Sequence, residues 1–122
     1  MLHHVRPGGG LQKGFAPNSL LEVTPEFLDG VITLVKQHGY DLLTMDEALG
    51  RISSDEPAKP FAVFTLDDAY RDNLLHARPV FRRHHCPFTI YACPAIQDGV
   101  CEIWWRGLES VIAGSTHLSG RI

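Results

Sequence analysis

The sequence predicts an α/β fold in which short parallel strands alternate with amphipathic helices. Two observations lead to this prediction. Short apolar runs, bounded by Gly, Pro or Asp, alternate with segments whose apolar residues recur at helical spacing. One run, Phe61 to Leu66, is almost continuously apolar, as a strand buried on both faces of a parallel sheet requires. The chain has 122 residues, and we expect a single domain over residues 1–122.

The N-terminal elements begin with a weakly marked strand, Leu2 to Val5. The residues from Arg6 to Ser19 are rich in Gly and Pro and predict a long loop. Thr24-Pro25 then predicts a helix start, because Thr caps a helix and Pro suits its first position. Gly39 is expected to end this helix. Its apolar residues share one face and are expected to point inward: Phe27, Leu28, Val31, Ile32 and Val35.

A second strand is predicted from Tyr40 to Leu43, and a second helix follows it and extends to Ile52. Thr44 and Glu47 have the spacing of a capping box at the start of that helix. The segment from Ser53 to Pro60 is polar and contains two prolines, so we expect a connection that leads into the apolar strand described above.

A third helix is expected after that strand, and Pro79 should kink or restart it. Residues Phe88 to Ala92 predict the next strand, which Pro94 closes. A last helix is expected from Glu102 to Ala113, whereas Ser115 to Ile122 lacks any periodicity. The third helix should carry three apolar residues on one side: Leu74, Leu75 and Ala77. The last helix should point four apolar residues inward: Trp104, Leu108, Val111 and Ile112.

The composition argues against several classes of function. The formal net charge is -3 and no basic run occurs, so nucleic acid is not an expected partner. No apolar stretch is long enough to span a bilayer, and the first residues lack a signal-peptide pattern, which predicts a cytoplasmic protein. Cys86, Cys93 and Cys101 lack C-x-x-C spacing, so we expect free thiols that pack as small apolar groups.

The clearest candidate for chemistry is Asp67-Asp68, directly after the apolar strand. Side chains at the C-terminal ends of parallel strands face the functional site rather than the core. Two adjacent carboxylates repel each other unless a cation or a hydrogen-bond donor compensates them. A divalent metal bound by one would leave the other free as a general base. The alternative is that one Asp caps the next helix while the other is solvated, and the dipeptide alone leaves both open.

The residues around this pair resemble the first signature of the polysaccharide deacetylase family. The family pattern Thr-Phe-Asp-Asp-Gly, often followed by Tyr, is similar to the segment Thr65 to Tyr70. Ala69 replaces Gly and Leu66 replaces Phe, and a position that needs a positive φ angle tolerates Ala poorly. Further segments resemble the nodulation-type branch, which includes chitooligosaccharide deacetylases: His3 to Pro7, Ala77 to Phe81, Pro87 to Tyr91, and Trp104-Trp105 with Leu108-Glu109.

This resemblance implies a (β/α) barrel of parallel strands with outer helices, incomplete in this chain. It implies hydrolysis of acetyl groups on an acetylated oligo- or polysaccharide. By position, Asp67 would be the general base, and Asp68 would bind Zn²⁺ or another divalent ion. His3 or His4 could approach Asp68 as a ligand or simply line the pocket, and Trp104-Trp105 could stack on a sugar or pack in the core.

The family's second signature, a His-x-x-x-His pair that completes the metal site, is absent from the sequence. None of the histidines after the acidic pair has a second histidine four residues later: His76, His84, His85 and His117. Catalytic zinc sites usually have three protein ligands. We therefore expect an incomplete site in a chain truncated on its C-terminal side, and enzymatic activity stays uncertain.

Three alternatives to an active deacetylase can be weighed against the sequence. A non-catalytic carbohydrate-binding or interaction remnant would keep the fold without the chemistry. A receiver-like phospho-acceptor domain would need a late lysine at another strand end, but the last lysine is Lys59. A phosphate-binding loop at Gly8-Gly9-Gly10 would need a following Lys-Ser/Thr and a helix start, which the sequence lacks.

Overall fold

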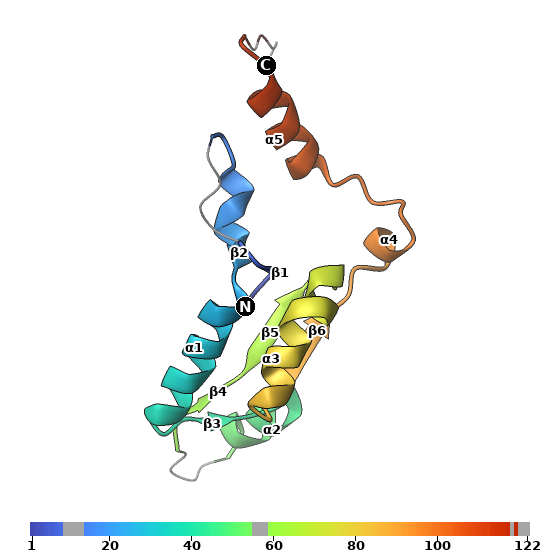
Figure 1. The fold of residues 1–122 in the computed structure, drawn as a ribbon. Coiled ribbons are helices and arrows are strands. Elements are labelled where there is room, and N and C mark those ends of the chain that lie inside the picture. Colours follow the sequence, from blue (N-terminus) through green and yellow to red (C-terminus); the bar gives the residue numbers. More distant parts are fainter. Residues whose placement is uncertain (9–13, 55–58, 118, 120–122) are drawn as a thin grey trace.

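Short parallel strands and helices alternate along the chain in the computed structural model, which describes residues 1–8, 14–54, 59–117 and 119 (Figure 1). The described elements, in chain order, are β1 (His4–Val5), η1 (Pro17–Leu21), β2 (Glu22–Val23), α1 (Pro25–Gln37), β3 (Asp41–Leu42), α2 (Met45–Ile52), β4 (Phe61–Ala62), β5 (Phe64–Asp67), η2 (Asn73–Ala77), α3 (Arg78–Arg83), β6 (Phe88–Tyr91), α4 (Pro94–Gln97) and α5 (Trp104–Gly114). The glycine run of the considered phosphate loop lies largely outside the described residues.

Within the described residues, every strand pairing is parallel, as the sequence predicts. β1 pairs with β2, β3 with β4, and β5 with β6. Leu2 also bridges to Leu66 of β5. The amide of Leu2 donates to the Thr65 carbonyl at 2.9 Å, and the Asp67 amide donates to the Leu2 carbonyl at 2.9 Å. This bridge places His3 and His4 beside the end of β5.

The predicted starts of α1 and α2 are confirmed in detail, whereas the last helix begins at Trp104 rather than at Glu102. The Thr24 side chain accepts a hydrogen bond from the Phe27 amide at 3.1 Å, and Pro25 occupies the first position of α1. The Glu47 amide donates to the Thr44 hydroxyl at 3.2 Å, while the Thr44 amide donates to the Glu47 carboxylate at 2.8 Å. This reciprocal pair is the predicted capping box.

The apolar core lies where α1 and α3 pack against β1 and β5. It consists of buried residues from these elements and their flanks: Val5, Leu28, Ile32, Leu66, Ala77, Val80, Phe81 and Cys86. The ring of Phe81 stacks on Phe88 at 4.5 Å and meets Phe64 edge-on at 5.6 Å. Burial also raises the pKa of the Cys86 thiol to about 11, as expected for a cysteine that packs as an apolar group.

The structure corrects three expectations about the chain up to β5. The run from Phe61 to Leu66 is two strands separated at Val63, and only Leu66 is fully buried, because the sheets are open rather than covered on both faces. The loop from Arg6 to Ser19 is followed by β2, and it already contains the start of η1. Phe27 is exposed on α1, because the packing face of that helix is narrower than predicted.

The C-terminal half departs further from the predicted burial. Leu74 and Leu75 are exposed because residues 73–77 form a π-helix, whose wider turn changes which side chains face inward. Pro79 lies in the first turn of α3, so the predicted restart is confirmed. In α5, Trp104, Leu108 and Val111 are exposed rather than inward, because the helix packs mainly on η1. α4 was not predicted.

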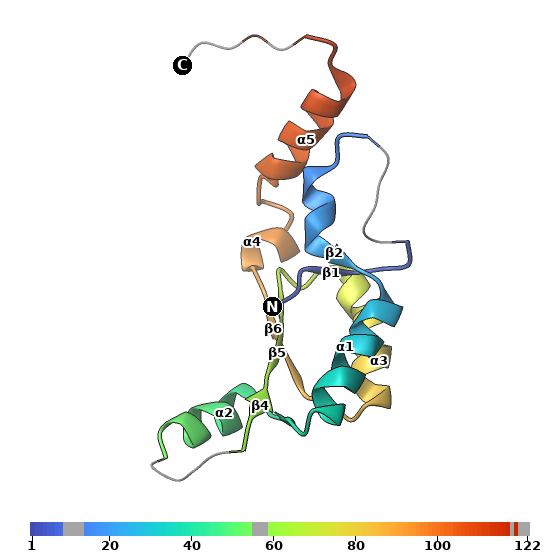
Figure 2. The same ribbon diagram turned by 90° about the vertical axis from the view of Figure 1, so that its left-hand side faces the viewer.

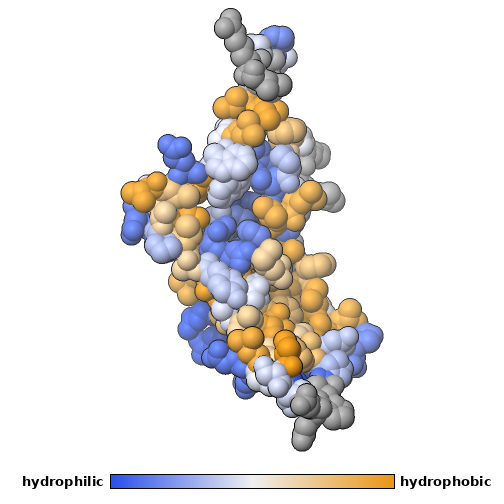
Figure 3. Space-filling model, turned by 180° about the vertical axis from the view of Figure 1, so that it is seen from behind, coloured by the Kyte–Doolittle hydropathy of each residue, from blue (hydrophilic) through white to orange (hydrophobic). Residues whose placement is uncertain are grey.

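α5 and η1 lie next to each other at one end of the molecule, away from α2 (Figure 2). Apolar side chains of this end remain in contact with solvent, and they appear orange near the top of Figure 3. None of the helices in the described part of the chain has the length and apolar character that crossing a membrane requires.

Candidate active site

The acidic pair lies at the C-terminal end of β5, as expected. Asp67 is the last residue of β5, and Asp68 begins the turn that follows. Asp68 and Ala69 both have positive φ angles, 66° and 51°. A residue with a side chain is strained in this region, and glycine is not. The turn therefore has a backbone shape that favours Gly, and here it is made with Ala69.

Asp68 opens onto a cavity of about 430 Å³ between β1, η1 and α5. His3, His4, Tyr70 and Arg106 also line this cavity. Oδ2 of Asp67 lies 3.6 Å from Nε2 of His3, and both side chains are about three-quarters buried. Protonated His3 would therefore form an ion pair with Asp67 at the edge of the cavity.

His4 forms the buried link between β1 and α5. Its Nδ1 lies 2.7 Å from Oδ2 of Asp72, and its Nε2 lies 2.7 Å from Nη2 of Arg106. A guanidinium only donates, so Nε2 accepts and the proton of the neutral ring lies on Nδ1, which donates to Asp72. Burial lowers the pKa of His4, and the charge of Arg106 lowers it further, although Asp72 opposes both effects. His4 is thus a neutral bridging group whose two nitrogens are occupied.

Tyr70 connects this bridge to the acidic pair. Its ring stacks on His4 at 3.9 Å, and the guanidinium carbon of Arg106 lies 5.6 Å from the ring centre. Burial raises the pKa of Tyr70, and the negative charge of Asp68 and a hydrogen bond to it raise it further. The neutral phenol therefore donates to Asp68 and orients that carboxylate in the cavity.

The two tryptophans form the aromatic wall of the cavity. Both line it, and their rings meet edge-on at 5.8 Å. Trp104 is 67% exposed, so the expectation that it packs inward is wrong. The Asn18 side chain donates to Glu109 at 2.6 Å and to the Trp105 carbonyl at 3.4 Å, which fixes η1 against α5.

Several residues of this site were missed by sequence reasoning. Asp72 belongs to the polar run after the signature, so its position near the site had a signal. Arg106 and Asn18 had none, because each is brought to the cavity by a contact between elements far apart in sequence: Arg106 with His4, and Asn18 with Glu109.

The site offers one clear oxygen ligand for a metal ion. Asp68 faces the cavity, whereas both nitrogens of His4 are already occupied. In the part of the chain that the structure describes, no three or more His, Cys, Asp or Glu side chains are grouped so as to hold a metal ion. These residues therefore do not supply the three protein ligands that a catalytic zinc site usually has.

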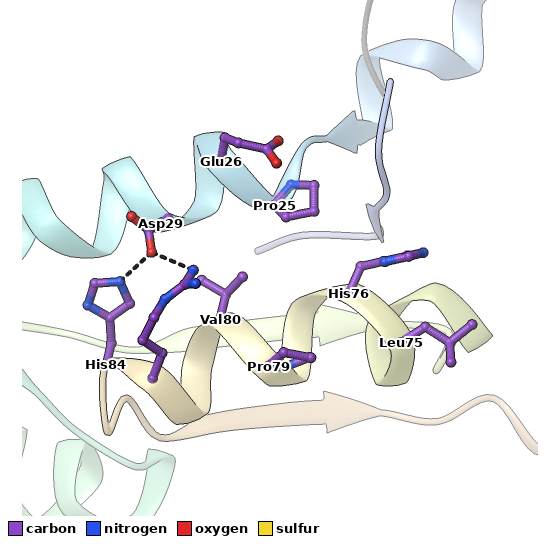
Figure 4. Close-up of a pocket in the computed structure, with 9 residues that line it drawn as sticks. Pro25, Glu26, Asp29, Leu75, His76, Pro79, Val80 and His84 are labelled. Carbon is purple, nitrogen blue, oxygen red and sulfur yellow. Dashed lines mark hydrogen bonds and ion pairs between the residues drawn. The ribbon is translucent and has the colours of Figure 1, made fainter.

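A larger cavity, about 740 Å³, lies between α1 and α3 (Figure 4), and neither residue of the acidic pair lines it. Asp29 accepts hydrogen bonds there from Arg83 at 2.7 Å and His84 at 2.8 Å. The hydrogen bond from His84, with help from Arg83, lowers the pKa of Asp29. This carboxylate is thus paired with groups across two helices, and Glu26 is a second carboxylate that lines the same cavity.

Comparisons with known proteins find a similar fold among deacetylases. No protein-family model matches the chain, and no curated protein matches it. The structure is similar to the Streptococcus pyogenes deacetylase PplD in complex with acetate, with a TM-score of 0.57 and 25% sequence identity over 72% of this chain. It is also similar to a de-N-acetylase from Aggregatibacter actinomycetemcomitans, with a TM-score of 0.57 and 18% identity over 73% of this chain.

At the level of fold, the chain therefore resembles two deacetylases, one of which is a de-N-acetylase. It spans 38% of the first of these proteins and 34% of the second, or little more than a third of each. The resemblance to deacetylases seen in the sequence is supported at this level.

Proposed function

We propose that the chain carries the acidic part of the active site of a carbohydrate de-N-acetylase, which hydrolyses the C–N bond of N-acetyl groups on sugars. The observation that carries this proposal is the placement of Asp67 and Asp68 at the end of β5, beside a cavity, in a deacetylase-like fold. In this proposal the parallel strands are part of a (β/α) barrel of the polysaccharide deacetylase type.

Each described residue has a role that its contacts support. Asp67 acts as the general base that takes the proton of the attacking water, and His3 at 3.6 Å holds its orientation. Asp68, oriented by Tyr70, supplies one ligand for Zn²⁺ or another divalent ion. Such an ion would polarise the acetyl carbonyl, and its remaining ligands must come from outside the described set.

The proposed substrate is an acetylated oligo- or polysaccharide, with chitooligosaccharides as the first class to test. The exposed ring of Trp104 offers a flat apolar surface to one face of a sugar ring. Polar groups converge on the same cavity from Asn18, Asp68 and Arg106. An apolar wall with a few placed polar groups is the usual composition of a small-molecule site.

Acetate release from N-acetylchitotetraose, with and without added Zn²⁺, tests the proposal. Asp67→Asn should abolish release, since an amide cannot accept the proton, whereas the control Asp98→Asn lies on an exposed turn and should leave it unchanged. Release that persists in Asp67→Asn would contradict the assigned role of Asp67.

A second candidate is a carbohydrate-binding chain without catalysis, because the described residues form a cavity at Asp68 but group no three side chains that could hold a metal ion. Binding of the tetramer without acetate release above blank would favour this candidate. Absence of both binding and release would remove both functions.

A further inference from the structure

β6 is an open edge of its sheet in the part of the chain that the structure describes. One side of this four-residue strand pairs with β5, from Phe88 to Tyr91. The other side of β5 is already bonded to Leu2, whereas no described strand pairs with the outer side of β6. An unpaired edge presents backbone donors and acceptors at the regular spacing that a further strand needs. β6 is therefore a template for one more strand.

The side chains of β6 do not protect this edge. Residues 88–91 include no charged residue and no proline, and Ile90 and Tyr91 are 40% and 50% exposed. A hollow of about 510 Å³ adjoins the start of the strand, with Phe81 and Phe88 among its walls. Free edges of natural sheets are usually blunted by charged side chains or proline. The composition of β6 therefore favours a strand that is covered in the assembled protein.

A second copy of the chain can cover β6 with the same strand. A two-fold axis perpendicular to the sheet joins the two strands antiparallel and keeps each face on its own side. Phe88 stacks on Phe81 at 4.5 Å, and side chains alternate along a strand, so Phe88 and Ile90 share the face toward α3. Pairing centred on Thr89 places Phe88 of each copy opposite Ile90 of the other. The pairing thus joins apolar side chains and brings no like charges together within the strand.

The charges beside the two ends of β6 are opposite in sign. Arg82 and His85 line the hollow at the start of the strand. Asp67 of β5 is in register with Tyr91 at the other end, and Asp68 follows it. Antiparallel pairing brings the start of each strand beside the end of the other, so the basic end of each copy approaches the acidic end of its partner. This complementarity favours a second copy as the strand that covers the edge.

We propose that the chain forms a symmetric dimer through antiparallel pairing of β6 with β6 of a second copy, which gives one sheet in the order β5-β6-β6-β5. Ile90 lies in the centre of this interface, and Arg82 lies at its rim. The dimer does not rest on the proposed function, since oligomeric state and acetate release are measured separately.

Sedimentation velocity of the full chain over an about hundredfold range of concentration tests the dimer. We expect the sedimentation coefficient to rise from the value of a monomer to that of a dimer. Ile90→Lys brings a charge opposite Phe88 and two like charges onto one face, so it should raise the dissociation constant at least about tenfold. Ile52→Lys is the matched control, because it makes the same exchange at a 69% exposed position at the end of α2 and should leave sedimentation unchanged.

Two further measurements separate the interface from a folding defect. Arg82→Glu on the exposed side of α3 should also weaken the dimer, since it reverses the charge at the rim. In the wild-type chain, amide hydrogen exchange at residues 88–91 should slow as the concentration rises, while exchange in α2 stays the same.

The result that overturns the dimer is equally direct. A monomer at every concentration would overturn it and leave the edge of β6 for a strand of another polypeptide. A dimer that persists unchanged in Ile90→Lys, or exchange at β6 that is independent of concentration, would overturn β6 as the interface.

Discussion

Two parts of the molecule are held together by different kinds of contact. The body, formed by α1, α3, β1, β5 and β6, surrounds the apolar core. The arm, formed by η1 and α5, has no fully buried residue in either helix. Polar contacts fix the arm instead, from Asn18 to Glu109 within it and from Arg106 to His4 of the body. The acidic pair belongs to the body, whereas the tryptophans and Arg106 belong to the arm.

This difference has consequences for both stability and function. Burial of apolar side chains dominates folding free energy, so the body should determine global stability. A helix that relies on a few partly buried polar contacts, without a core of its own, opens at lower cost than the apolar core does. Trp104 and Trp105, which form the aromatic wall of the cavity at Asp68, are therefore the part of the site that can move relative to Asp67 and Asp68.

The largest expected effect comes from removing a ring in the body. Phe81 is fully buried between Phe64 and Phe88, so Phe81→Ala should reduce the free energy of unfolding by about 3–5 kcal/mol. Leu108→Ala in the arm removes an exposed side chain and should change it by less than about 0.5 kcal/mol. Urea unfolding measures both values. Similar losses in the two variants would show that body and arm are one cooperative core.

Thiol reactivity compares the two parts without unfolding the chain. Cys86 is buried in the body, and its raised pKa of about 11 against an ordinary 9.0 leaves about 100-fold less thiolate near neutral pH. Cys93 and Cys101 are only partly buried and lie on the path from β6 to α5. With a thiol-reactive disulfide we expect two fast groups and one slow group, and Cys86→Ala should remove the slow one.

Denaturant provides the control for this experiment. All three thiols should react at similar rates in the unfolded chain, because burial no longer separates them. A native chain with three equally fast thiols would contradict the closed core around Cys86.

The contrast between body and arm also explains what the sequence could predict. Thr24, Thr44 and Glu47 act on backbone groups within a few residues, so local pattern was sufficient to find the helix starts. The place of Asp67-Asp68 followed from an apolar run that ends in two carboxylates. Local pattern also gave the parallel pairing of the strands.

The arm could not be predicted in this way. Its amphipathic pattern indicated an inward face with Trp104, but nothing in a single helix says whether another element will cover that face. The partner of Arg106 is His4, at the opposite end of the sequence. Long-range polar contacts of this kind leave no periodicity, and for that reason Arg106 and Asn18 were missed.

A smaller effect on the free energy of unfolding is expected at the turn that places Asp68 at the cavity. Ala69 has a φ angle of 51°, where glycine is free of the steric penalty, so Ala69→Gly should raise the free energy of unfolding by roughly 1 kcal/mol. Gly107→Ala on α5 is the control with the reverse substitution. It should also stabilise its element, because a helix interior favours Ala over Gly by a similar amount. Destabilisation by Ala69→Gly in a urea titration would show that this turn relaxes in solution.

The smallest expected effect lies at the junction of body and arm, where the stability of the chain should depend on pH. The pKa of His4 is lowered from its ordinary value of 6.5, first by burial and then by Arg106, so the unfolded chain takes up this proton before the folded chain does. His4 therefore contributes its full stability above pH 6.5, and the contribution is lost as the pH falls below that value. Thermal unfolding between about pH 7 and 5 should show this loss in the wild-type chain.

His4→Gln should flatten the dependence of the melting temperature on pH, whereas His38→Gln on the exposed end of α1 should keep it. An unchanged slope in His4→Gln would mean that the ring is already accessible to protons, and that the arm leaves the body more readily than the contact between Arg106 and His4 implies.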